Sequence, residues 1–217
     1  MPNFEGDGFR KGNVDGTEFL YFLQGGLDCC CGFYSVINAF SYLFARDFLA
    51  NEHRVNSELL RRDKGFYWKK IKSHRLVREH IATAYWQGAY PRDVEELAQF
   101  VNDEIFGGKY VIERFDDHGG FKDKNRALEP FSSQEVHLVK AVHLVLVEES
   151  KEDEEGHWIV LVRNQAEAYG CIIDSNRCYV DWVLNDNPFQ LVVHREAEEG
   201  DIEIHKVQST ISISRPA

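Results

Sequence analysis

The fold is decided by Gln24-Gly25-Gly26-Leu27-Asp28-Cys29-Cys30-Cys31-Gly32-Phe33-Tyr34-Ser35-Val36-Ile37-Asn38-Ala39-Phe40, where three cysteines separate a glycine turn from an apolar segment. From Gly32 to Phe48 the apolar residues recur every three or four positions, which predicts a helix. The cysteines therefore stand where a helix begins. The unpaired N–H groups and partial positive charge of a helix start stabilise a thiolate and the oxyanion that it creates. This stretch therefore predicts a thiol nucleophile.

Position on the helix distinguishes the three adjacent cysteines. Each helical residue advances by about 100°, which puts Cys31 opposite the apolar stripe. Ser35 and Asn38, which are small or polar, continue the face of Cys31. We therefore choose Cys31 as the nucleophile; burial of all three as inert apolar side chains is the other interpretation. The stripe consists of Phe33, Val36, Ile37, Phe40, Leu43 and Phe44.

Composition favours one globular domain in a reducing compartment. At 217 residues and 43% hydrophobic content the chain can bury a full core, and we expect a single domain over residues 1–217. Its five cysteines are odd in number and three are contiguous, which argues against a disulfide scaffold. The sequence has no apolar run of membrane length and no secretory signal, so we expect a cytoplasmic protein without a membrane span.

The negative charge of the chain is concentrated in its second half. The net charge is −11, and residues 111–217 carry 11 Lys and Arg against 21 Asp and Glu. Such a field repels a polyanion, and no basic and aromatic recognition motif offsets it. We therefore expect no nucleic-acid partner.

The order of the predicted elements indicates an α+β fold. A short apolar run at Thr17–Leu23 predicts a strand that leads into the glycine turn. Helices dominate the first half and short β-branched strands the second, which is typical of an α+β protein with a mostly antiparallel sheet. The predicted helices are Gly32–Phe48, Ser57–Arg62, Trp68–Tyr85 and Pro91–Ile105. The predicted strands of the second half are Val136–Val147, His157–Arg163, Gly170–Asp174, Phe189–His194 and Ile202–Ser214, with a loop at Glu148–Glu155.

A thiol nucleophile needs a base within hydrogen-bond reach and a third group that orients the base. His157 opens the run His-Trp-Ile-Val-Leu-Val-Arg at the mouth of a predicted strand, and Asp174 ends the next strand 17 residues later. A hairpin of these two strands brings the two side chains together. His143 is a competing base, and Asn176 and Asp181 are competing third members.

These residues together resemble the papain-like cysteine peptidases. The similar segments are Gln24, Asp28 with a Cys-Gly pair at a helix start, His-Trp-Ile-Val-Leu-Val and Ile-Ile-Asp. Their order is that of the branch that processes bacteriocin leaders. The resemblance implies a papain-like fold in which Cys31 is the nucleophile, His157 the base, Asp174 the orienting acid and Gln24 the oxyanion-hole donor.

The chain departs from the family pattern around the nucleophile. Family members usually place the cysteine six residues after the glutamine. Cys30 has that spacing from Gln24, whereas Cys31 is one residue further and has the Cys-Gly pair. Cys30 therefore stays open as the alternative, and Ala45–Val147 is largely unmatched.

The resemblance implies hydrolysis of a peptide or isopeptide bond in a protein or peptide substrate through a thioester on Cys31, without a metal or organic cofactor. A transglutaminase or acyltransferase uses the same triad but lets an amine resolve the thioester. A binding module that keeps the fold without catalysis is a further alternative. A zinc site at the cysteine triplet lacks the usual Cys-x-x-Cys spacing. Gly107-Gly108 resembles a double-glycine cleavage signal, and we interpret it as a turn after a helix.

Overall fold

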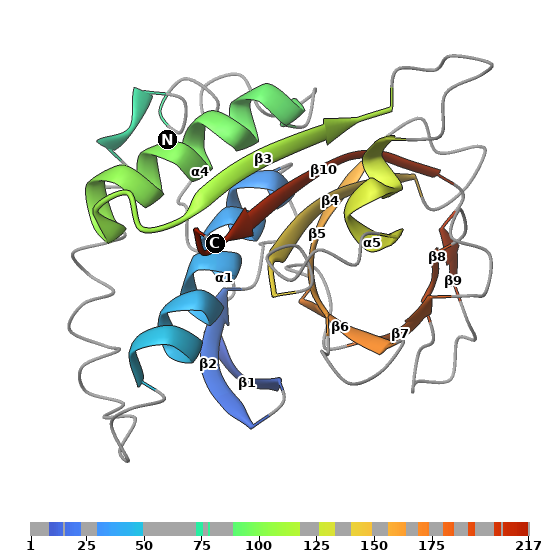
Figure 1. Cartoon of the computed structure of the whole chain (residues 1–217), viewed down its shortest axis with the longest axis horizontal. Coiled ribbons are helices and arrows are strands. Elements are labelled where there is room, and N and C mark those ends of the chain that lie inside the picture. The colour runs from blue at the N-terminus through green and yellow to red at the C-terminus, as the bar shows by residue number, and fades with distance from the viewer. Residues whose placement is uncertain are drawn as a thin grey trace.

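The structure is a computed structural model, and its described residues form an α+β fold (Figure 1). They comprise an eight-stranded antiparallel sheet, a separate two-stranded hairpin and several helices. The α+β class predicted from the sequence is therefore confirmed. The structure describes residues 9–14, 16–22, 30–49, 73–75, 78, 89–117, 126–132, 140–148, 156–163, 169–173, 180–184, 191–193, 202–204 and 206–216.

The N-terminal hairpin packs on the helix that carries the cysteines. β1 (Phe9–Val14) and β2 (Thr17–Phe22) pair antiparallel across a turn at Gly16, whose φ of 79° suits a residue without a Cβ. β2 lies against α1 (Cys31–Phe44), which continues as a short π-helical turn (Ala45–Leu49). The strand and the helix predicted for this region are thus confirmed.

A second long helix, α4 (Pro91–Phe106), begins and ends as its sequence predicts. Pro91 occupies the first turn, where its missing N–H removes no helical hydrogen bond, and Tyr90 precedes it in an extended conformation. Gly107 and Gly108 follow with φ values of 67° and 70°, the left-handed conformation that commonly ends a helix. The double glycine is therefore a helix end, as expected.

The large sheet is antiparallel between all neighbouring strands, in the order β3-β10-β4-β5-β6-β7-β8-β9. Figure 1 shows the sheet curling round from β5 through β6 and β7 to β8. Its strands are β3 (Val111–Asp116), β4 (Val142–Glu148), β5 (His157–Arg163), β6 (Tyr169–Ile173), β7 (Val180–Leu184), β8 (Leu191–Val193), β9 (Ile202–Ile204) and β10 (Lys206–Ser214).

The two faces of this sheet carry different helices. α1 packs on one face, against β4 and β5. A 3₁₀ turn, η2 (Arg126–Leu128), and the short helix α5 (Glu129–Ser132) pack on the other. The side chains of β5 alternate accordingly: Trp158 and Val160 join the cluster around α1, whereas Ile159 joins the cluster beside α5.

Two predicted strands differ from those observed. The strand predicted at residues 202–214 is two strands, because β9 pairs with β8 while β10 pairs with β3 and β4. The strand predicted at residues 136–147 begins at Val142, since Lys140 lies in a turn. The helices predicted at residues 57–62 and 68–85 lie outside the described residues, apart from 73–75 and 78, and so does the predicted loop beyond Glu148.

Three observed strands, β1, β3 and β7, are absent from the sequence-based prediction. β3 has the sequence Val-Ile-Glu-Arg-Phe-Asp, which mixes charged and apolar residues. It lies at one edge of the sheet and pairs only with β10 among the described strands. An edge strand tolerates charged side chains, so the alternation typical of a strand is weak here.

A buried carboxylate, Asp47, holds the C-terminal end of α1. Its oxygens accept hydrogen bonds from Arg46 at 2.8 Å, from the Tyr110 hydroxyl at 2.8 Å and from Arg215 at 3.1 Å. Burial acts to raise the pKa of Asp47, but these donors outweigh it and hold the pKa below its ordinary value. The network ties this end of α1 to the α4–β3 connection and to the residue after β10, at the opposite end of the helix from Cys31.

Candidate active site

α1 begins at the cysteines, as the sequence predicts. Cys30 precedes the helix, and its carbonyl accepts the N–H groups of Phe33 and Tyr34 at 2.9 and 3.1 Å. Cys31 is therefore the first helical residue, and the N–H groups of Cys31 and Gly32 precede the first hydrogen bonds of the helix. The first turn, which the structure describes completely, has no acidic side chain to offset its partial charge of about half a unit. Cys31 therefore lies at the positive end of the helix.

All faces of α1 are buried from Cys31 to Phe40, including the face opposite the apolar stripe. Ser35 and Asn38, on the face of Cys31, have no exposed surface because they contact β5 and β2. Cys31 keeps 7% of its surface exposed against 2% for Cys30. Of the two described cysteines in the triplet, Cys31 is therefore the more accessible.

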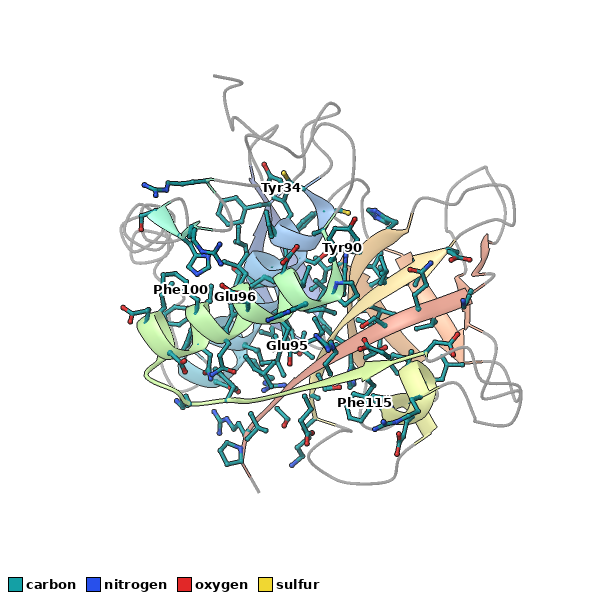
Figure 2. All side chains as sticks on the ribbon, turned by 90° about the horizontal axis from the view of Figure 1, so that it is seen from above. Tyr34, Tyr90, Glu95, Glu96, Phe100 and Phe115 are labelled. Atoms are coloured by element: carbon teal, nitrogen blue, oxygen red, sulfur yellow. The ribbon has the colours of Figure 1, made fainter. Side chains whose placement is uncertain are left out.

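Gly32 brings the start of α1 into direct contact with two other elements. A Cβ at this position would lie 2.8 Å from Ala89 Cβ, 2.8 Å from Val94 Cγ2 of α4 and 3.1 Å from Trp158 Cδ1 of β5. The indole N–H of Trp158 donates to the carbonyl of Ala89 at 2.8 Å. The starts of α1, α4 and β5 therefore meet at one place, where Figure 2 shows Tyr90 at the beginning of α4.

Replacing Gly32 with alanine is expected to destabilise the fold, because the added methyl group enters space that Ala89, Val94 and Trp158 already occupy. The expected loss in the free energy of unfolding is about 1–3 kcal/mol, the usual cost of an overpacked core. Urea unfolding of the wild type and the Gly32→Ala variant measures it. A glycine in an ordinary helix behaves oppositely, since alanine there stabilises by up to about 1 kcal/mol; a gain of that kind would contradict the close contact.

A hydrogen bond ties α1 to β5 one turn further along the helix. Ser35 Oγ donates to the carbonyl oxygen of Trp158 at 3.0 Å, and both residues are buried. Cys31 directly precedes Gly32 in α1, and His157 directly precedes Trp158 in β5. The structure therefore brings together the two segments that carry the predicted nucleophile and the predicted base.

His157 is the half-buried first residue of β5 and pairs with Val147 of β4. Because side chains alternate along a strand, His157 lies on the sheet face of Ile159, opposite to the face of Trp158. α1 packs on the Trp158 face with its first turn at the mouth of β5. Side-chain alternation therefore places His157 on the sheet face opposite to the one on which α1 packs.

The predicted third members are placed differently. Asp174 and Asn176 lie outside the described residues, and β6 ends at Ile173. Asp181 lies in β7, where its backbone pairs with Cys171 of β6. Because β6 separates β7 from β5, Asp181 is not on a strand adjacent to His157.

Gln24, the predicted oxyanion donor, also lies outside the described residues. The described residue nearest to it in the sequence, Phe22, is held by Asn38 of α1. The Asn38 amide accepts the N–H of Phe22 at 2.7 Å and donates to its carbonyl at 3.1 Å. The helix that begins with Cys31 thus also holds the end of β2, two residues before Gln24.

His143, the competing base, is a core residue of β4. It is fully buried, with Nδ1 2.9 Å from Ser212 Oγ and its ring 5.2 Å from that of Phe131 between centroids. It pairs with Leu161, four residues into β5 from His157. These contacts indicate a structural role for His143.

Sequence reasoning does not single out the residues that join the site together. Trp158 and Ala89 are apolar residues whose contacts become visible only in the folded chain. Tyr90 is 59% exposed beside them, and its carbonyl accepts the N–H groups of Asp93 and Val94 at 2.9 and 3.1 Å. A tyrosine before a proline at a helix start is the signal that marks this rigid backbone in the sequence.

Within the described part of the chain, no three His, Cys, Asp or Glu side chains gather closely enough to hold a metal ion. Cys29, which a zinc site at the triplet would require, lies outside that part. None of the described helices combines the length and the hydropathy needed to cross a membrane.

Comparisons of the chain with protein-family models, with curated proteins and with solved structures yield no match. The chemistry of the site therefore rests on the residues themselves and on the contacts between their elements.

Proposed function

We propose that the chain is a papain-like thiol hydrolase that cleaves an amide bond in a protein or peptide. Cys31 is the nucleophile, His157 the base and Asp174 the acid that orients it. The observation that carries the proposal is the contact of the α1 start with the β5 start, made by Gly32 against Trp158. In the papain-like peptidases that the chain resembles, the reactive thiol lies at a helix start and its base at the start of a strand. In this chain the two segments that make the contact are 126 positions apart in the sequence.

The proposed reaction begins with a proton passing from Cys31 to His157, which creates a thiolate and an imidazolium. The thiolate attacks the amide carbonyl carbon and forms a C–S bond, and the carbonyl oxygen becomes an oxyanion. The backbone N–H at the helix start and the Gln24 amide would bind this oxyanion. The C–N bond then breaks as His157 protonates the leaving amine, and water cleaves the resulting thioester to a carboxylic acid.

The end of β6 supports Asp174 as the third member. Ile173, the last residue of β6, packs in the cluster around α1. Ile173 pairs with Val160 of β5, three residues from His157. Asp174 follows Ile173 in the sequence, and β6 is the strand that pairs with β5.

Tyr90 supports a polypeptide as the substrate. An exposed aromatic ring on a backbone held by a helix cap offers contact area with little loss of entropy. This ring lies beside the place where the three element starts meet. We therefore propose that Tyr90 contacts the substrate chain next to the cleaved bond.

Alkylation with iodoacetamide, followed by peptide mapping over the five cysteines of the chain, tests the proposal. A thiolate paired with an imidazolium reacts in the acidic range, so we expect Cys31 to be labelled first at about pH 6. The His157→Ala variant is expected to lose this labelling. Without the imidazole the thiol reacts only as the pH approaches the pKa of a free cysteine, about 8.5.

Two results of this experiment would contradict the proposal. If the labelling of Cys31 is unchanged in the His157→Ala variant, Cys31 and His157 do not form an ion pair. A Cys31 that is inert in the wild type would favour a binding module without catalysis.

A further inference from the structure

Ser35 makes a contact that its position in a helix does not require. A serine inside a helix commonly bonds to a carbonyl of its own preceding turn. Ser35 instead donates across to the carbonyl of Trp158 in β5, at 3.0 Å and with no exposed surface. This is a bond between two elements that are 123 residues apart in sequence.

The bond joins the two segments that carry the proposed reacting pair. Ser35 is four residues after Cys31, so the two side chains lie on the same helix face one turn apart. The acceptor, Trp158, is the neighbour of His157 in β5. The bond therefore connects α1 to β5 at a point one helical turn from Cys31 and one residue from His157.

Other contacts limit the remaining movements at this junction. Gly32 lies close enough to Trp158 to set how near α1 approaches β5. The indole N–H of Trp158 fixes the side chain against Ala89. The indole hydrogen bond does not involve α1, and the contact at Gly32 is apolar and has no directional preference, so neither opposes a slide of α1 along its own axis. The Ser35 hydrogen bond is directional and opposes that slide.

We infer that Ser35 is a positioning residue that sets the distance between Cys31 and His157, an inference that rests on the proposed function. A thiol and an imidazole exchange a proton only within hydrogen-bond reach, about 2.6–3.2 Å. A displacement of about 1 Å in a reacting pair costs about 100-fold in rate. Ser35 acts through Trp158 and does not touch the substrate.

The test compares two variants that each remove one buried hydroxyl. Ser35→Ala removes the hydroxyl that bonds to Trp158. Thr210→Val removes a buried hydroxyl that donates to the carbonyl of Ala127 at 2.7 Å, beside η2 on the other sheet face. Both lose one hydrogen bond to a backbone carbonyl, so both melting temperatures should fall by a similar amount, about 2–4 °C.

The readout that separates them is the rate at which iodoacetamide alkylates Cys31, measured from about pH 5 to pH 9 well below both melting temperatures. Ser35→Ala is expected to slow alkylation at about pH 6 by about tenfold or more, while the rate at the alkaline end stays close to that of the wild type. Thr210→Val is expected to keep the wild-type profile at every pH.

Three outcomes would overturn the inference. A wild-type profile in Ser35→Ala would show that the hydroxyl serves stability alone, and the proposed function would stand. Equal slowing in Thr210→Val would assign the loss to general destabilisation. If Cys31 of the wild-type protein is not alkylated in the acidic range, both the proposed function and the positioning role of Ser35 are contradicted.

Discussion

Cys31→Ala is expected to abolish turnover of an amide substrate, lowering the rate by about 10⁴-fold or more. The bond that forms in the first step is made by this sulfur, so no other group replaces it. The fold should persist, because the variant removes a single sulfur atom from this buried side chain. Substrate hydrolysis, followed with a peptide library, measures the effect, and circular dichroism confirms that the variant is folded.

Cys30→Ala is the matched control for this prediction. Cys30 is also buried and is adjacent in the sequence, so its replacement perturbs the same end of α1. It precedes the helix, whereas Cys31 is its first residue. We expect Cys30→Ala to keep most of the activity. Loss in Cys30→Ala together with full activity in Cys31→Ala would show that the six-residue spacing from Gln24 decides the nucleophile.

Asp174→Asn is expected to lower turnover by about 10²–10⁴-fold while substrate affinity changes little. An orienting acid stabilises the imidazolium and selects its tautomer without touching the substrate. The loss should therefore fall on kcat and leave KM nearly unchanged. Steady-state kinetics of the purified variant separates the two.

The two competing third members provide the comparison. Asn176→Ala and Asp181→Asn should each keep near-normal turnover, and for Asp181 the reason is its place on β7, beyond β6. Normal turnover in Asp174→Asn with a large loss in either of the others would reassign the acid. Normal turnover in all three would leave a Cys and His pair that acts without a third member.

The helix start at Cys31, α4 and β5 follow from local sequence alone. Apolar spacing of three and four predicts α1, and Pro91 with the double glycine predicts both ends of α4. A short β-branched run bounded by polar residues predicts β5 at its observed bounds. Each of these signals is local, because hydrogen bonds within a helix and strand propensity depend on near neighbours.

The strand partners could not be predicted in the same way. β10 lies between β3 and β4, so strands far apart in sequence become neighbours. β9 and β10, read as one strand, separate because they pair with different partners. Pairing depends on which surfaces are buried together, and a single strand does not encode that choice.

The sequence by itself determined the residue types of the site and the elements that carry them: a cysteine that begins an apolar helix and a histidine that begins an apolar strand. Only the tertiary structure decided that these two starts meet, through Gly32 against Trp158 and through Ser35 bonded to the Trp158 carbonyl. It also placed His143 in the core. The physical reason is that helix and strand signals act over a few residues, whereas the meeting of the two starts depends on close packing between segments far apart in the chain.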